Sequence, residues 1–538
     1  MWATALRRAQ GRMPADRVLS AALLLQLLPL LLLARVVTVD GPAHLAGAAV
    51  LLSYDDPGRD VLRRLYEVDL RPVPNMLTTL VLAGLLHLTG PDVAERLLVG
   101  AYVVLLTLGL RYALRGVHVQ AGWLAVAALP FAGNYLYYYG FYNFCLSLSL
   151  TLFVLGLALR RRDGWSGQAV AGLSVLLVLA WFAHLLPLLI AGLFVAVLAV
   201  LRALPARRTG GALRAVRTHV LAPALAALPI LLLTASFLAS PAAERGTPVR
   251  RSAADLVLGL ATLGRPLAVY SRYEYLPATA VALTLVALVV VARRSGRPSS
   301  PERQALACTA ALCTVLYLAS PDRYGPDYGF LNDRLSLFPP LLLLLWTAGP
   351  VPDPRFRRLV VGALLSAAVL LAGLRVPTEI RYQRDVAEML SVAAKIPQGS
   401  TMLSLQLWRD PAVGGPVGNQ FRDPLRHQAG RLAVLLDGVD VGHYEATLDY
   451  FPTRFRAGND LRRRIDPSLT GLNRIPPAID LAAGSEDIDA VLVIGREQAG
   501  PALLARPDTQ RLLRDLAADY ERTAVSERSG LVEVWTRR

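Results

Sequence analysis

A carboxylate and an imidazole stand close together just after the first apolar run of the chain. Asp40 and His44 lie four residues apart in the stretch Val39-Asp40-Gly41-Pro42-Ala43-His44. Residues at this spacing share one face of a helix, so both side chains can contact the same group. Ionisable groups at a membrane boundary are candidate functional residues by default. The structural alternative is that Asp40 only caps a short helix over 42–53.

An arginine later in the chain is a candidate for binding a phosphate group. Arg334 stands at the outer end of an apolar segment that begins at Leu335, against the positive-inside trend. Its planar guanidinium group matches the geometry of a phosphate. Pairing with Asp333, or a side chain that reaches out of the bilayer, is the structural alternative.

Two further places combine polar and aromatic side chains. His184 lies where two apolar segments meet, and it is either solvated or in contact with a ligand. Residues 134–143 are rich in tyrosine and include Tyr138 and Asn143. Tyrosine belts are routine at membrane interfaces. Aromatic rings also pack against sugar faces and isoprenoid chains.

The composition places these residues in a polytopic membrane protein. Hydrophobic residues make up 54% of the chain and come in blocks of bilayer length. The net charge of +16 comes mostly from arginines between these blocks, which orient the chain among membrane lipids and do not indicate nucleic-acid binding. The three cysteines lie in or beside apolar segments, so they predict neither disulfides nor a zinc site.

The arginine-rich loops also predict the topology. With these loops and the N-terminal residues Arg7, Arg8 and Arg12 inside, the later segments alternate without conflict if 38–95 stays outside. Segment 75–90 is then a juxtamembrane or re-entrant helix, and about eleven spans remain. The expected apolar segments cover 18–37, 75–90, 96–114, 121–134, 142–159, 168–183, 185–201, 218–239, 275–292, 304–319, 335–348 and 359–374.

The chain divides near Arg375 into a membrane module over 1–375 and a soluble α/β domain over 376–538. In the second part we expect strands at 400–405 and 488–494 and a helix over 509–520 capped by Asp508. A hairpin is expected over 522–526 and 531–536. Between the first two strands lie Gly442-His443-Tyr444-Glu445 and the aromatics and arginines of 450–456. These residues indicate a surface that faces the membrane module or its substrate; packing in the core of the domain is the alternative.

Several of these features resemble the GT-C superfamily of integral-membrane glycosyltransferases. The resemblance rests on Asp40 just outside the first span, on a first outer loop with a juxtamembrane helix, and on Thr89-Gly90-Pro91-Asp92 leading into Ala94-Glu95-Arg96-Leu97. Similar bacterial membrane proteins carry an Asp-Gly-Pro-Ala-His stretch, a Pro-Asn pair near position 75 and a stretch like Gly140–Asn143. The likeness covers most of the membrane module.

The resemblance implies transfer of a sugar from a polyprenyl-phosphate lipid donor to a glycan, lipid or protein acceptor at the outer face of the cell membrane. Asp40 would be the general base, and Arg334 would stabilise the phosphate, with His184 and His44 as helpers. Asp333, Tyr138 and Asn143 are further expected substrate contacts. Some relatives use a divalent metal, Mg²⁺ or Mn²⁺, but no Asp-x-Asp pair occurs at Asp40.

Two other functions stay open at this point. A transporter or flippase for a lipid-linked glycan would usually show paired repeats and charges near mid-membrane. A non-catalytic scaffold that binds glycans through its extracytoplasmic C-terminal domain is the other alternative. The missing Asp-x-Asp pair is compatible with such a scaffold.

Overall fold

The computed structural model describes residues 13–208, 212–239, 247–296, 298–324, 329–350, 353–408 and 423–538. The N-terminal arginines Arg7, Arg8 and Arg12 lie outside these ranges, as do residues 325–328 in the loop before Arg334.

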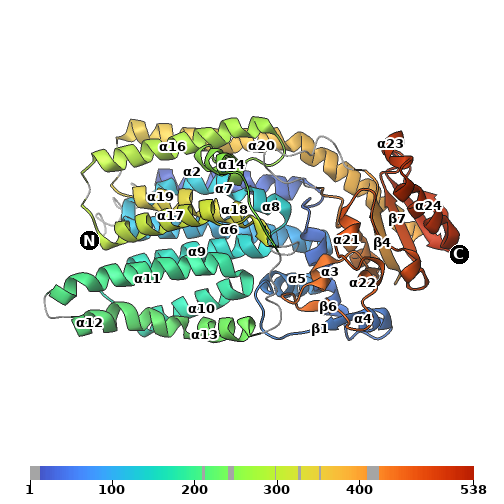
Figure 1. Cartoon of the computed structure of the whole chain (residues 1–538). Coiled ribbons are helices and arrows are strands. Elements are labelled where there is room, and N and C mark those ends of the chain that lie inside the picture. The colour runs from blue at the N-terminus through green and yellow to red at the C-terminus, as the bar shows by residue number, and fades with distance from the viewer. Residues whose placement is uncertain are drawn as a thin grey trace. The chain divides into compact units, whose positions relative to one another are not determined.

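Long apolar helices make up most of the chain (Figure 1). Within the described ranges, six helical stretches are long and apolar enough to cross a membrane. They contain or overlap α6 (Pro91–Val117), α9 (Tyr142–Arg160), α11 (Leu185–Arg208), α13 (Ala222–Leu238), α16 (Tyr275–Arg294) and α20 (Pro354–Ser391). The expected class, a polytopic helical membrane protein, is confirmed.

Further helices account for the remaining apolar segments. They are α2 (Met13–Leu32), α7 (Ala128–Ala132), α10 (Gly167–Ala183), α17 (Pro301–Ala319) and α19 (Phe338–Thr347). The segment expected at 121–134 is divided between a 3₁₀ helix, Val119–Ala127, and α7. In the segment expected at 335–348, the helix α19 begins only at Phe338. Pro339 and Pro340 lack an amide hydrogen and therefore fit the first turn of a helix.

The described residues form two compact units. We refer to 13–32 and 99–375 as the helical unit, and to 33–98, 376–408 and 423–538 as the sheet unit. Residues 33–98, which the sequence places in the membrane module, therefore pack with the C-terminal part of the chain. The division into domains at 375 and 376 stays a prediction.

Close helix packing in the helical unit depends on glycine. A side chain added at Gly156 of α9 would place its Cβ 2.4 Å from Tyr112 of α6, and one at Gly116 would lie 3.0 Å from the carbonyl oxygen of Gly156. Small residues let membrane helices approach each other in this way. Helices α9 and α11 run alongside each other in Figure 1, and α10 packs on both.

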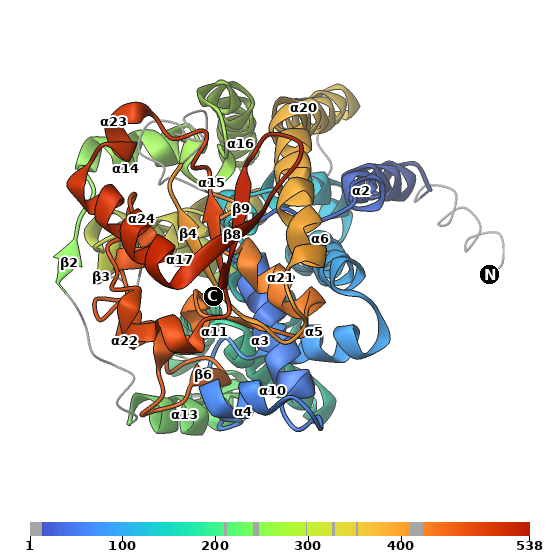
Figure 2. The ribbon, with the colours of Figure 1, turned by 90° about the vertical axis from the view of Figure 1, so that its right-hand side faces the viewer.

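The sheet unit contains a five-stranded sheet in the order β5-β4-β7-β9-β8. β4 (Thr401–Gln406) pairs in parallel with β5 (Val439–Asp440) and β7 (Ala490–Ile494). β9 (Val532–Arg537) pairs antiparallel with β7 and with β8 (Tyr520–Val525), beside which it lies in Figure 2. The expected strands and hairpin are confirmed. The cap is wrong, because α24 (Pro507–Asp519) begins before Asp508, which lies in its first turn.

Segments far apart in sequence meet in the sheet unit. α3 (Gly41–Ser53) packs against α5 (Leu77–Leu88) and α21 (Gln428–Leu435), and β1 (Tyr66–Val68) pairs antiparallel with β6 (Thr453–Phe455). α5 has 12 residues, which is short for a membrane span, as expected for segment 75–90. Gly430 allows α21 to approach α3, since a Cβ there would lie 2.7 Å from the carbonyl oxygen of Pro42.

The remaining elements are short. They are α4 (Asp60–Leu65), α8 (Tyr135–Tyr139), α12 (Ala212–Val216), α14 (Ala253–Ala261), α15 (Gly264–Leu267), α18 (Leu331–Leu335), α22 (Leu461–Ile465), α23 (Pro501–Leu504), β2 (Pro248–Val249) and β3 (Arg323–Tyr324). β2 and β3 pair antiparallel in the helical unit.

Candidate active site

The start of α3 fixes the backbone of Asp40 and leaves its carboxylate for other contacts. The carbonyl oxygen of Asp40 accepts hydrogen bonds from the amides of Ala43 and His44, at 3.0 and 3.1 Å. Within the described part of the chain, the Asp40 side chain makes no capping hydrogen bond. The amide of Gly41 donates instead to the hydroxyl of Thr38. Asp40 thus occupies the N-cap position, but its side chain is not the cap.

The Asp40 carboxylate is buried among residues of the C-terminal part of the sheet unit. Asp40 is 4% exposed. The Nε2 atom of His427 lies 3.7 Å from its Oδ1 atom. The hydroxyl of Tyr444, which donates to Oε1 of Glu445 at 3.5 Å, also lies close enough to interact with the Asp40 carboxylate. The rings of His427 and Tyr444 contact each other with centroids 4.9 Å apart. The carboxylate is therefore largely excluded from bulk water and lies among polar side chains.

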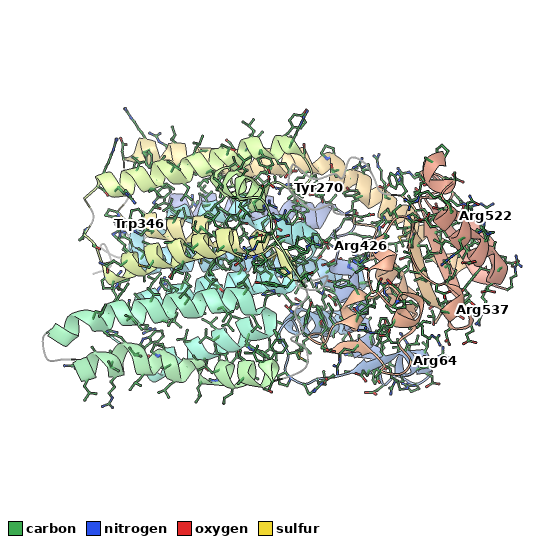
Figure 3. The ribbon with its side chains drawn as sticks, viewed as in Figure 1. Arg64, Tyr270, Trp346, Arg426, Arg522 and Arg537 are labelled. Atoms are coloured by element: carbon green, nitrogen blue, oxygen red, sulfur yellow. The ribbon has the colours of Figure 1, made fainter. Side chains whose placement is uncertain are left out.

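Burial raises the pKa of Asp40 to about 7, and the negative charge of Glu445 adds to this effect. Attraction to His44, the hydrogen bond from Tyr444 and the charge of Arg426 oppose it. Arg426, labelled in Figure 3, lies just before α21. A general base works best when its pKa is close to the working pH. Asp40 meets this condition near neutral pH.

A second buried carboxylate, Glu445, lies on the other side of His44. The Nδ1 atom of His44 is 2.6 Å from Oε1 of Glu445, and Nε2 of His443 is 3.8 Å from Oε2. Burial raises the pKa of Glu445, but attraction to His44 and hydrogen bonds from His44 and His443 outweigh it and leave the pKa at about 2. Glu445 is therefore a permanent negative charge at neutral pH.

The two carboxylates thus differ widely in proton affinity although both are buried. His44 sits between a fixed anion, Glu445, and a titrating acid, Asp40. Such divergence between neighbouring acids is a common mark of acid–base chemistry. Burial also lowers the pKa of His427 well below its usual value, with help from the charges of Arg426 and Arg462. A neutral His427 beside Asp40 leaves the carboxylate free to accept a proton.

The motif that begins at Thr89 holds α21 in place. The guanidinium group of Arg431, 1% exposed, forms ion pairs with Asp92 and Glu95 at the start of α6. Arg35 also pairs with Asp92, at 3.2 Å. Since α21 follows His427 directly, these ion pairs fix the segment that contacts Asp40. Their role here is to position the site and not to take part in the chemistry.

In the helical unit, Arg334 and His184 lie close enough to interact electrostatically. The Arg334 guanidinium group packs over the ring of Phe141 at 4.7 Å and donates to the carbonyl oxygen of Gly329 at 2.9 Å. The Nδ1 atom of His184 accepts a hydrogen bond from the amide of Leu186 at 3.1 Å. Its Nε2 atom therefore carries the proton in the neutral ring and can donate to an anion.

Asp333 does not pair with Arg334. Its carboxylate oxygens bind Arg251 at 3.1 Å and Arg265 at 3.2 Å, and Asp333 is 1% exposed. Arg251 also pairs with Asp322 at 2.9 Å. The pairing suggested as the structural alternative for Arg334 is therefore wrong. Asp333 fixes the backbone from which Arg334 projects.

Tyr138 and Asn143 lie in the same aromatic region of the helical unit. The guanidinium group of Arg375 stacks over Tyr138 at 5.1 Å, and Tyr270, labelled in Figure 3, meets its ring edge-on at 5.4 Å. Asn143, 4% exposed, lies in the first turn of α9. Asp40 and His44 belong to the sheet unit, whereas His184, Arg334, Asp333, Tyr138 and Asn143 belong to the helical unit.

The residues around Asp40 do not fit a metal ion. Among the described residues, no group of three or more His, Cys, Asp or Glu side chains is arranged to hold one. The acidic neighbour of Asp40, Glu445, is engaged with two histidines.

The sequence did not identify the partners of Asp40 as site residues. The aromatic and charged stretch 442–456 is visible in the sequence, and it contains His443, Tyr444 and Glu445. Arg426 and His427 carry no comparable signal. Their relation to Asp40 comes only from the packing of α21 on α3.

Comparison with solved structures shows the fold: the chain shares the fold of ArnT, a GT-C glycosyltransferase, as the sequence resemblance implied. The structures it resembles include ArnT from Cupriavidus metallidurans in the apo state, with a TM-score of 0.57, 13% identity and 97% of each chain covered. The chain also resembles ArnT from the same organism bound to undecaprenyl phosphate. Here the TM-score is 0.53 and the sequence identity 14%, with 97% of each chain covered. No family model and no curated protein matches the chain.

Proposed function

We propose that this protein is a membrane glycosyltransferase that moves a sugar from a polyprenyl-phosphate donor to an acceptor hydroxyl at the outer face of the membrane. The observation that carries the proposal is the buried Asp40 carboxylate, whose pKa of about 7 suits a general base. The GT-C fold, shared with an ArnT structure that holds undecaprenyl phosphate, supports the choice of donor.

In the proposed reaction the acceptor oxygen forms a bond to the anomeric carbon of the donor sugar. Asp40 takes the hydroxyl proton as this bond forms, and the bond between the anomeric carbon and the phosphate oxygen breaks. The polyprenyl phosphate leaves with the electron pair. Tyr444 and neutral His427 orient the carboxylate. Removal of the proton is needed because an unactivated hydroxyl is a poor nucleophile.

Arg334 is the proposed partner of the donor phosphate. Charge develops on the phosphate as the sugar departs, and preorganised cationic donors stabilise such charge. Its guanidinium is already oriented by Phe141 and Gly329. His184, which interacts electrostatically with Arg334, supplies a second donor in this proposal.

The test is transfer of radiolabelled sugar from polyprenyl-phosphate sugars in membranes, with wild-type protein and Asp40→Asn. We expect loss of about 10² to 10⁴ in rate, the usual contribution of a general base. Equal transfer by both proteins would remove Asp40 as the base. A flippase or a scaffold would move or bind the lipid-linked sugar without forming a labelled product. Labelling of introduced cysteines from outside intact cells tests the proposed extracytoplasmic side of the C-terminal region.

A further inference from the structure

A second cleft lies within the sheet unit, apart from the contacts of Asp40. Its volume is about 710 Å³, within the range of small-molecule sites. It is formed where β4 and β7 end, by the segments that follow these strands and by residues 473–478 from the connection between β5 and β7. The residues that give it chemical character are Trp408, Asn473, Arg474, Arg506 and Asp508.

The strand order explains why a cleft forms at this edge. β4 is the first strand, and the chain places β5 on one side of it and β7 on the other. The connections from β4 and β7 therefore lead to opposite sides of this pair of strands. Parallel sheets bind ligands at such switch points, outside the carboxyl ends of the strands. Gln406 and Ile494 pair at these ends.

Trp408 is held at the floor of the cleft by a glycine. Gly495 follows β7 with φ +75°, and a Cβ there would lie 2.4 Å from Cβ of Trp408. The amide of Leu407 donates to the carbonyl oxygen of Ile494 at 2.9 Å, which extends the pairing of the two strands up to the tryptophan. Trp408 is only partly buried. A partly exposed tryptophan therefore lines the cleft directly after the paired strands.

Planar polar groups line the same cleft as this aromatic residue. Arg506 and Asp508 form a two-point ion pair, with distances of 2.6 and 3.1 Å. Asn473 and Arg474 are exposed on the opposite segment. Within the described ranges Arg474 forms no ion pair. Amide, carboxylate and guanidinium groups each offer two hydrogen-bonding atoms in one plane, which suits the neighbouring hydroxyls of a sugar ring.

We propose that this cleft is a saccharide-binding site, in which a sugar ring stacks on Trp408 and its hydroxyls bond to Asn473, Arg474 and Asp508. An aromatic face packs against the C–H face of a sugar, and the polar groups at its rim give orientation. This site is separate from the transfer chemistry and does not depend on Asp40 acting as a base. A glycan held here would be bound through a unit other than the one that reacts.

The test uses full-length protein in lipid nanodiscs and saturation-transfer difference NMR. The probes are methyl glycosides and disaccharides of glucose, mannose, galactose and arabinose. We expect at least one sugar to receive saturation, and Trp408→Ala to weaken its binding about tenfold, the equivalent of one aromatic contact. Trp408→Phe should retain binding, because it keeps an aromatic face. Trp165→Ala, in a loop of the helical unit, is the matched control and should bind like wild type.

Arg474→Ala should also weaken binding while the thermal unfolding midpoint stays that of wild type, since this side chain is exposed. The proposal fails if no sugar of the panel receives saturation. It also fails if Trp408→Ala, shown to be folded by its unfolding midpoint and by the behaviour of Trp408→Phe, binds as well as wild type. Because the readout is binding and not transfer, failure here leaves the proposed transferase reaction untouched.

Discussion

Nδ1 of His44 lies 2.6 Å from Oε1 of Glu445, although the two residues are 401 positions apart in the chain. This contact joins the first turn of α3 to the 3₁₀ helix Tyr444–Thr447, which follows β5. The imidazole of His44 is engaged with Glu445, and burial of the neighbouring Asp40 carboxylate outweighs the opposing charges of His44 and Arg426. The consequence is an acid that is buried but still titrates near neutral pH.

The rate of sugar transfer should depend on the ionisation of Asp40. The pKa of Asp40 is raised to about 7, so kcat/KM should fall about tenfold for each pH unit below that value as the base becomes protonated. In Glu445→Gln the removal of a nearby negative charge should move this acidic limb to lower pH. A pH–rate profile of the two proteins checks the shift. An acidic limb at the same pH in both would contradict it.

Asp40→Asn should make the protein more stable at high pH. A buried acid with a raised pKa destabilises the fold once pH exceeds its unfolded value of 3.8, and the cost reaches its maximum above about 7. The shift corresponds to at most about 4 kcal/mol. The unfolding midpoint of Asp40→Asn in detergent should exceed that of wild type at pH 8, and the difference should vanish near pH 4. A lower midpoint at pH 8 would count against the burial argument.

Ionised Glu445, in contrast to ionised Asp40, should stabilise the fold. Its pKa is lowered from 4.5 to about 2, so its stabilising contribution is present above pH 4.5 and is lost as pH falls towards 2. The shift corresponds to about 3 kcal/mol. Glu445→Gln should lower the unfolding midpoint at pH 7, because it leaves His44 buried without its anion. Measured between pH 7 and 3, the gap to wild type should narrow; a constant gap would contradict the ion pair.

Arg334 and Asp333, neighbours in sequence, should give contrasting variants. Arg334→Ala should keep the unfolding midpoint and raise KM for the polyprenyl-phosphate donor, since the residue is proposed to bind its phosphate. Asp333→Asn should be destabilised by about 3 to 5 kcal/mol, because it removes the carboxylate that binds the buried Arg265, whereas Arg251 keeps its ion pair with Asp322. Thermal unfolding and donor titration of both variants separate the two roles. An Arg334→Ala protein with unchanged KM would remove the phosphate assignment.

Much of the fold could be predicted from the sequence because its signals are local. Apolar runs of bilayer length predict helices such as α9 and α16, whose bounds agree closely with the expected segments. The strands β4 and β7 and the hairpin of β8 and β9 were likewise visible as short apolar runs separated by turn residues. The N-cap predicted for α24 was wrong, because the helix begins at Pro507 and Asp508 lies in its first turn.

The sequence by itself determined that this is a membrane protein and that Asp40 and His44 stand together at the start of one helix. Only the tertiary structure decided which side chains contact Asp40 and His44, and therefore the pKa of the Asp40 carboxylate. Tyr444, His427 and Glu445 reach Asp40 and His44 because α21 packs on α3 across a glycine, and that packing links segments nearly 400 residues apart. The ion pairs of Asp333 with Arg251 and Arg265 could not be predicted from the sequence either. Adjacent residues of a helix point in different directions, so Asp333 does not face its neighbour Arg334. Burial and charge environment depend on these distant contacts, whereas periodicity depends only on neighbours in the chain.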